Sequence, residues 1–550
     1  NKKLVTLKNC LISGNSADSK AGGVLIGEGA VQAVLENCTI SDNTGGTGGV
    51  WFRNLSATNT SNVTLKGCTI QNNTGTSAGG VDFPGGGTLT LIDTVMTNNA
   101  GTCAIKLPST ATLKLGGATT VYDNLTSAGA QCNINVTSTA GTIEVVQQIM
   151  QDSKIGVTRS ASGRLTVNYG VYNDADDPAD FFYPDNTIFV AEAMDVALSG
   201  GGTQKEVNLV SLAPANQWET AVKNSLANGG ATYTAVMYAD WNATSGSFGS
   251  VSNCYTSGAL YVPSGASVIL ELNGHTVNRG LTSARSAGYV AYVAGTLTIH
   301  DNSATEANGT GGTGKITGGY NSSNNVGSFV QFGVGGHVIL ESGTVTGCKS
   351  NYQFIMISQS GALFEMKGGS ISENTVPSNA TFIYTGHRGN INITGGEIVG
   401  NTAGYSLLRA VPNDGGGSIN IKGSVTDPVV VSNNTILDNS LLYVEDDCDL
   451  EYVNFENNSS AGVLIKVEQS STKLTMTNCV WRNNTAMNRF YVNAASTATV
   501  FENVTFTENE KENFIYTAWW VVANSSFTVT GGEFTNNVSV ARSFYIFNLT

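Results

Sequence analysis

The stretch NVTLKGCTIQNN at residues 62–73 decides the fold. It holds an apolar pair (V-T-L), two further residues, a pair with a small first member (C-T-I), and a closing asparagine. The same phrase returns about every 25 to 30 residues, which is the period of a solenoid. The asparagines that close its copies are Asn15, Asn43, Asn73, Asn99, Asn374, Asn401, Asn458, Asn484, Asn509 and Asn537.

Each pair has the two-residue periodicity of a β-strand, in which alternate side chains share one face. The two residues between the pairs shift that alternation, so the chain must bend there to keep both pairs inward. Gly67 suits such a corner. A further apolar segment, such as 48–52 or 463–465, lies between successive phrases. We therefore expect an all-β parallel β-helix with about three short strands per coil and coils about 4.8 Å apart. General crossover rules favour the right-handed sense.

Repeated polar and small residues predict ladders along this helix. The closing asparagines should stack, because their amides can bond each other and corner backbone groups, and asparagine tolerates left-handed corners. Cys10, Cys38 and Cys68 occupy one position in three consecutive coils. We interpret them as a ladder of buried free thiols, since free cysteine packs as a small hydrophobe. A disulfide between neighbouring rungs is the alternative, which parallel side-chain directions disfavour.

The phrase fades after about residue 140, which divides the chain. Residues 1–140 are interpreted as the C-terminal part of a first β-helix, 141–212 as a cap or connector, and 213–550 as a second β-helix. Residues 218–222 form the one plausible short helix. Because the first residue already lies inside a coil phrase, we expect the sequence to be a piece of a longer protein.

Composition excludes several classes of function. The net charge is −14 and there is no basic stripe, so nucleic acid is a poor partner. No apolar run approaches the ~20 residues of a membrane helix, so we expect no membrane insertion in this segment. Nine cysteines without a C-x-x-C motif and only four histidines leave little material for metal sites.

One acidic run is a candidate metal site. It comprises Asp174, Asp176, Asp177 and Asp180, in the connector. The favoured interpretation is a solvated or cap-stabilising turn, and the more specific alternative is a structural Ca²⁺ site. The acidic residues 445–449 are interpreted as a plain surface turn. We expect no other cofactor.

Trp519 and Trp520 are candidate ligand-binding residues. They are adjacent, so on a strand one of them must face outward. An exposed aromatic ring on a ridged β surface suits sugar stacking or self-association, and burial under a loop is an equally good interpretation.

Several motifs give a resemblance to known repeats. Residues 262–276, 295–301 and 314–319 resemble the start of right-handed β-helix modules in large bacterial surface adhesins, chiefly of Gram-positive gut organisms. Residues 154–157 with Phe181-Phe182 are similar to the ends of such modules. The segments 48–50 and 534–537 are similar to polymorphic outer-membrane protein repeats. This resemblance implies the β-helix fold and a surface location, and it assigns no ligand.

We therefore expect a non-enzymatic structural or adhesive module of a large cell-surface or fibre-forming protein, outside the cell. Its expected partners are neighbouring modules or copies of itself end to end, and host or matrix glycans or proteins. The alternative is a polysaccharide lyase or glycoside hydrolase of the β-helix type. No catalytic residue is assigned, because neither the His300-Asp301 pair nor His387 has the companions that such chemistry needs.

Overall fold

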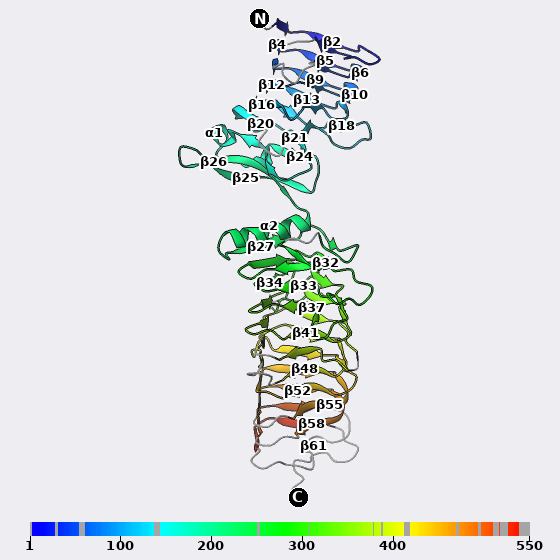
Figure 1. Ribbon diagram of the computed structural model, residues 1–550, viewed down its shortest axis with the longest axis vertical. Helices are drawn as coiled ribbons and strands as arrows, with labels where there is room; N and C mark the ends of the chain where they lie inside the picture. Colours follow the sequence, from blue (N-terminus) through cyan, green and yellow to red (C-terminus); the bar gives the residue numbers. More distant parts are fainter. Residues whose placement is uncertain are drawn as a thin grey trace. The chain divides into compact units, whose positions relative to one another are not determined.

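The structure, a computed structural model, describes residues 3–27, 31–53, 61–136, 143–249, 253–306, 308–377, 379–386, 389–411, 418–468, 472–492, 497–509, 516–517 and 526–537. The chain forms two compact units, Asn1–Leu212 and Ala213–Thr550. In each unit the short strands of one coil pair in parallel with the equivalent strands of the coils before and after it (Figure 1). The predicted all-β parallel β-helix is confirmed.

The first unit contains three parallel sheets and one antiparallel sheet. The seven-stranded sheet consists of β1 (Lys3–Lys8), β4 (Val31–Glu36), β8 (Ser61–Lys66), β12 (Gly87–Ile92), β16 (Ala111–Gly117), β20 (Ile143–Ile149) and β23 (Thr166–Val167). The twelve-stranded sheet consists of β2 (Leu11–Ser13), β5 (Thr39–Ser41), β9 (Thr69–Gln71), β13 (Val95–Thr97), β17 (Thr120–Val121), β21 (Ile155–Thr158), β19 (Ile134–Asn135), β15 (Ile105–Lys106), β11 (Val81–Asp82), β7 (Val50–Phe52), β3 (Val24–Ile26) and β24 (Phe182–Pro184). The smaller sheets are β18 (Leu125–Thr126), β14 (Ala100–Gly101), β10 (Thr74–Ala78) and β6 (Thr44–Thr47), and the antiparallel β22 (Gly163–Arg164), β26 (Thr203–Ser211) and β25 (Phe189–Ala197).

The second unit has three long sheets that follow the three strands of its coil. One contains β27 (Thr232–Val236), β31 (Ser267–Glu271), β34 (Thr296–His300), β38 (His337–Leu340), β42 (Leu363–Met366), β45 (Asn390–Ile393), β49 (Ile419–Lys422), β53 (Cys448–Glu451), β56 (Lys473–Thr477), β59 (Ala498–Glu502) and β62 (Ser526–Thr530). The next contains β28 (Trp241–Asn242), β32 (Thr276–Asn278), β35 (Lys315–Thr317), β39 (Thr344–Thr346), β43 (Ser370–Ser372), β46 (Glu397–Val399), β50 (Val429–Ser432), β54 (Val453–Glu456), β57 (Val480–Arg482), β60 (Thr505–Thr507) and β63 (Glu533–Thr535). The thirteen-stranded sheet contains β29 (Tyr255–Thr256), β30 (Ala259–Val262), β33 (Ala291–Val293), β37 (Gly327–Phe332), β41 (Gln353–Ile357), β44 (Ile383–Thr385), β48 (Ser406–Ala410), β52 (Ser440–Val444), β55 (Ser459–Val467), β58 (Thr485–Val492), β61 (Tyr516–Thr517), β51 (Thr435–Ile436) and β47 (Thr402–Ala403), and β36 (Tyr320–Asn321) pairs with β40 (Lys349–Ser350) beside it.

The bend between the two pairs of each phrase is made by one residue in the left-handed region. Gly67 has φ +60° between β8 and β9, and Asn37 and Asp93 have φ 54° and 50° at the same corner of neighbouring coils. The predicted bend is therefore present. The residue before each ladder asparagine except Asn133 is also left-handed, as Asn72 is (φ 56°), whereas the ladder asparagines are not. The left-handed corner is thus made by the preceding residue, and the ladder asparagine contributes its side chain.

The asparagine ladder is confirmed in both units. The Asn73 Oδ1 accepts from the backbone N–H and the Nδ2 of Asn43, at 3.0 Å each, and the Asn73 Nδ2 donates to the Asn99 Oδ1 at 3.0 Å. The first unit stacks Asn15, Asn43, Asn73, Asn99, Asn124 and Asn133. The second unit stacks Asn374, Asn401, Asn434, Asn458, Asn484, Asn509 and Asn537. Asn124, Asn133 and Asn434 are rungs that the sequence phrase did not predict.

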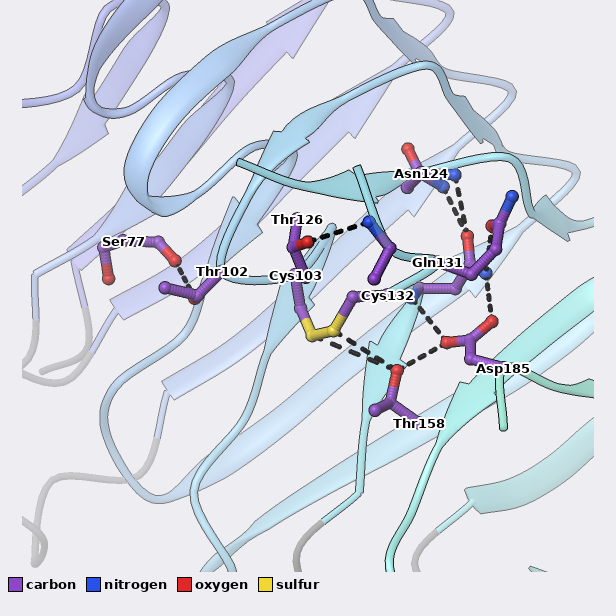
Figure 2. Close-up of a disulfide and its surroundings, with 11 residues drawn as sticks. Ser77, Thr102, Cys103, Asn124, Thr126, Gln131, Cys132, Thr158 and Asp185 are labelled. Carbon is purple, nitrogen blue, oxygen red and sulfur yellow. Dashed lines mark hydrogen bonds between the residues drawn. A yellow bond between two sulfur atoms is a disulfide. The ribbon is translucent and has the colours of Figure 1, made fainter. Parts of the chain in front are cut away.

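A carboxylate ends the ladder of the first unit (Figure 2). The backbone N–H and the Nδ2 of Asn133 donate to the two oxygens of Asp185 at 2.8 and 2.5 Å, and the Thr158 hydroxyl donates to the same group. In each rung the backbone N–H and the Nδ2 both donate to the Oδ1 of the next asparagine. The last rung, Asn133, therefore needs another acceptor for these two donors, and a carboxylate suits this place because it accepts hydrogen bonds and has no donor of its own. Asp185 meets that need.

The first stack continues past residue 140, where the sequence phrase ends. β20 pairs in parallel with β16, and β23 pairs with β20. After these coils the antiparallel β25 and β26 and the short helices α1 (Tyr169–Tyr172) and η1 (Pro178–Asp180) follow. Val207 and Leu209 of β26 join the buried core of the first unit, so part of 141–212 is coil and part covers the end of the stack.

The predicted short helix is present as α2 (Pro214–Ala227), at the start of the second unit. Its buried face includes Trp218 and Val222, which belong to the core of that unit. The Trp218 Nε1 donates to the Cys254 carbonyl at 3.0 Å, which satisfies the buried indole. The helices of the described part of the chain are too short for a membrane span.

Candidate functional site

The outer face of the thirteen-stranded sheet carries one register position on which tyrosines and cations recur. Flanking residues such as Leu442 and Val444 are buried inward, so the residue between them faces outward. We call this position the tyrosine column. Its members are Tyr261, Tyr292, Gln331, Met356, Tyr384, Arg409, Tyr443 and Lys466, and its register continues through Tyr491 to Tyr516.

Aromatic rings and cations alternate in the middle of the column. The Arg409 Cζ lies 4.6 Å from the ring centroid of Tyr443 and 5.8 Å from that of Tyr384. The Lys466 Nζ lies 4.8 Å from the ring centroid of Tyr443, and the Arg409 Cζ lies 5.4 Å from the ring centroid of Tyr405. Such cation–π contacts order the rings and cations along the column.

Carboxylates neutralise the cations of the column. The Nε and Nη2 of Arg409 both lie 2.8 Å from the Glu445 Oε2, and the Lys466 Nζ lies 3.0 Å from the Glu468 Oε1. The Tyr443 hydroxyl donates to the Glu468 carboxylate. Burial first, and then this hydrogen bond and the nearby carboxylates, raise the pKa of Tyr443 well above its usual range. Tyr443 therefore stays protonated and is a poor general base.

Other titratable groups on the outer surface of the second unit also pair between coils. The His300 Nδ1 lies 2.5 Å from the Glu271 Oε2, and the His337 Nε2 lies 2.8 Å from the Glu365 Oε2.

Asp301 does not pair with His300. Its carboxylate accepts from the backbone N–H of Gly274 and of Gly314 at 2.8 Å each. Burial acts to raise the pKa of Asp301, but hydrogen bonds from Ser303 and these backbone groups outweigh it and keep that pKa low. Asp301 thus organises a turn.

Only some of the predicted site residues are among those that the structure describes. Trp519, Trp520 and His387 lie outside the described residues. In the acidic run Asp177 caps η1 by accepting from the Ala179 N–H at 3.0 Å, and Asp176 accepts from the Asn173 Nδ2 at 2.8 Å. No group of three or more His, Cys, Asp or Glu side chains suited to a metal occurs among the described residues. The other two members of the run are Asp174 and Asp180, and calcium binding there stays a prediction.

The acidic turn at 445–449 has more structure than a plain surface turn. Glu445 pairs with Arg409, and the Asp449 Oδ2 lies 2.5 Å from the Lys422 Nζ. The Asp447 carboxylate accepts from the Lys473 N–H at 2.8 Å. The turn therefore ties three neighbouring coils together.

The cysteines divide into free thiols and one disulfide. Cys10, Cys38 and Cys68 are free, and the last two are buried. Cys103 and Cys132 form a disulfide between adjacent coils, with their Cα atoms 4.7 Å apart (Figure 2). This bond was not predicted from the sequence, although both cysteines lie two residues before paired positions, Ile105 and Ile134. That shared register is the feature of the sequence from which the disulfide could have been predicted.

We expect the Cys103→Ser/Cys132→Ser double variant to lower the free energy of unfolding of the first unit by about 2–4 kcal/mol, because the bond restrains the unfolded chain. Thermal denaturation of both proteins with and without reductant measures this. Reductant should lower the stability of the natural protein and leave the variant unchanged. Peptide mapping that finds both cysteines alkylated without prior reduction would contradict the bond.

Comparison with known proteins adds to these observations. Residues 1–170 match the family model described as a right handed beta helix region. The fold is thus an all-β parallel β-helix, and the match supports its right-handed sense. No curated protein matches the chain. A solved structure of the PL6 family alginate lyase AlyGC is 11% identical and aligns over 98% of this chain and 80% of its own, with a TM-score of 0.28. A likeness that weak supports no conclusion about activity.

Proposed function

We propose that this protein is a non-enzymatic, extracellular module of a large cell-surface or fibre-forming protein, and that its tyrosine column contacts glycans. The observation that carries the proposal is the column itself. Its tyrosines share one register position, on adjacent coils at Tyr261 and Tyr292 and on either side of Arg409 at Tyr384 and Tyr443, while its cations are neutralised by Glu445 and Glu468. Such a surface offers aromatic contact area and hydrogen-bonding groups.

The spacing of the column suits an extended sugar chain. Neighbouring coils are about 4.8 Å apart, close to the length of one hexopyranose unit in an extended polysaccharide. Tyr261, Tyr292 and Tyr384 are half-buried, so part of each residue stays accessible to solvent. A sugar ring can lie against such an aromatic surface, and the hydroxyl groups can bond the adjacent charged pairs.

The disulfide supports a location outside the cytoplasm. Structural disulfides form and persist in oxidising compartments and are rare where thiols are kept reduced. Cys103 and Cys132 are almost fully buried, and the bond links neighbouring coils of the first unit. This is consistent with a surface or secreted protein.

A polysaccharide lyase or hydrolase is the alternative. The column does gather residue types that elimination chemistry uses, Arg409, Tyr443 and Lys466. However, a lyase needs a group ready to accept a proton, and here the Tyr443 hydroxyl donates to Glu468 while its pKa is raised. The cations are likewise engaged by carboxylates, so the arrangement favours binding over cleavage.

Replacing Tyr384 with alanine is expected to weaken glycan binding about tenfold, which corresponds to ~1.4 kcal/mol, because it removes one aromatic contact from the column. A glycan array probed with the full chain identifies a binding glycan, and titration of that glycan measures the affinity of each variant. Tyr238→Ala is the matched control, since Tyr238 is 46% exposed and lies outside the column. An array without any bound glycan, or equal losses in both variants, would overturn the proposal.

A further inference from the structure

A buried arginine in the second unit lacks a charged partner. Arg279, directly after β32, is only 1% exposed. Its Nη2 donates to the Ser257 carbonyl at 3.0 Å and its Nε to the Tyr289 carbonyl at 3.3 Å. Its Nη1 is buried and has no hydrogen-bond partner among the described residues. Leaving a buried charge without a counter-charge is costly, so this guanidinium is a group that a ligand can satisfy.

A second guanidinium approaches the same point. A methyl group added to Gly246 would lie 3.6 Å from the Arg279 Nη1 and 3.7 Å from the Arg285 Cζ. Arg285 is exposed to solvent, and among the described residues no carboxylate forms an ion pair with either arginine. Burial, and then the charge of Arg285, lower the pKa of Arg279 to about 10, which leaves the Arg279 guanidinium cationic at neutral pH.

Arg279 is linked to the start of the tyrosine column through Tyr289. The ring of Tyr289, whose carbonyl bonds Arg279, lies 6.2 Å from that of Tyr292, and Tyr292 lies 5.5 Å from Tyr261. Tyr261 and Tyr292 are the first two members of the tyrosine column. Arg279 is therefore connected through Tyr289 to the first rings of the column, and Arg285 meets Arg279 at Gly246.

We propose that Arg279 and Arg285 form an oxyanion site above Gly246, which takes the carboxylate or sulfate group of an acidic sugar bound at the start of the tyrosine column. The sugar part of this inference rests on the proposed function. Two converging guanidiniums suit such anions because each offers several N–H donors in a planar fork. The exposed Arg285 gives the anion its path from solvent. The Leu281 side chain, whose Cδ2 lies 2.8 Å from the added methyl position, must move to admit it.

Calorimetric titration of the full chain with sodium sulfate, sodium glucuronate and glucose, at constant ionic strength, tests the site. Sulfate and glucuronate are expected to bind saturably, and glucose is not. Arg285→Gln should weaken both anions at least tenfold. Its side chain is exposed, so we expect the variant to fold. Lys315→Gln removes an exposed charge from the neighbouring coil and serves as the control.

Absence of anion binding, or equal losses in Arg285→Gln and Lys315→Gln, would overturn the site. Binding of sulfate without glucuronate would overturn its assignment to acidic sugars. These results are separable from the proposed function, because neutral glycans that depend on Tyr384 can bind the column whether or not the oxyanion site exists.

Discussion

Replacing Asn73 with alanine is expected to lower the free energy of unfolding of the first unit by about 3–6 kcal/mol, since each buried group left without its hydrogen bond costs roughly 1–3 kcal/mol. The Asn73 Oδ1 accepts from the N–H and Nδ2 of Asn43, and its Nδ2 donates to the Ile40 carbonyl at 2.9 Å and to Asn99. Asn73 is fully buried, so water cannot replace these partners. Urea denaturation followed by circular dichroism measures the change.

Asn62→Ala is the matched control for this prediction. Asn62 lies in the same coil, on β8, but its side chain is exposed. Its replacement should change the free energy of unfolding by less than ~0.5 kcal/mol. If both variants lose the same stability, the ladder does not hold the coils together.

Replacing Trp481 with alanine is expected to lower the free energy of unfolding of the second unit by about 3–5 kcal/mol, because it leaves a cavity in the core. Trp481 is fully buried and stacks on Phe455, with ring centroids 3.9 Å apart, and on Phe506 at 5.8 Å. The stack continues from Phe506 to Phe534 at 5.6 Å. Chemical denaturation of the full chain, monitored in the transition of the second unit, measures the loss.

Trp481→Phe separates the stack from the indole. The Trp481 Nε1 is buried and has no hydrogen-bond partner among the described residues. Phenylalanine keeps a ring in the stack and removes this unsatisfied group, so we expect a loss below ~1.5 kcal/mol. A loss as large as that of the alanine variant would show that ring stacking at this position contributes little.

The coil could be predicted because its phrase is local. Two pairs and a closing asparagine define two strands and a rung within about a dozen residues, as at 62–73. The missed rungs depart from that spacing. Asn434 follows a coil in which the loop 423–428 separates the two pairs, and Asn124 follows one with an additional residue at 116–118. Asn133 is only nine residues beyond Asn124, so no period could predict it.

The candidate site depends on which residues of different coils come into register, and the spacing of residues in the sequence does not give that register. Triplets such as Ala291–Val293, Ile383–Thr385 and Leu442–Val444 place a tyrosine between inward residues, which was a usable signal. Whether these tyrosines align depends on the register of strands separated by loops of variable length. The pairing of Arg409 with Glu445, 36 residues away, and the burial of Arg279 follow from that register.

The most direct test of the proposed function is to incubate the full chain with polysaccharides, including alginate and polygalacturonate, and to follow binding and chain length in one sample by size-exclusion chromatography. We predict that at least one polysaccharide elutes with the protein and that its chain-length distribution stays unchanged. Shorter chains or unsaturated ends that accumulate with time, in proportion to protein concentration, would contradict a non-enzymatic adhesive module.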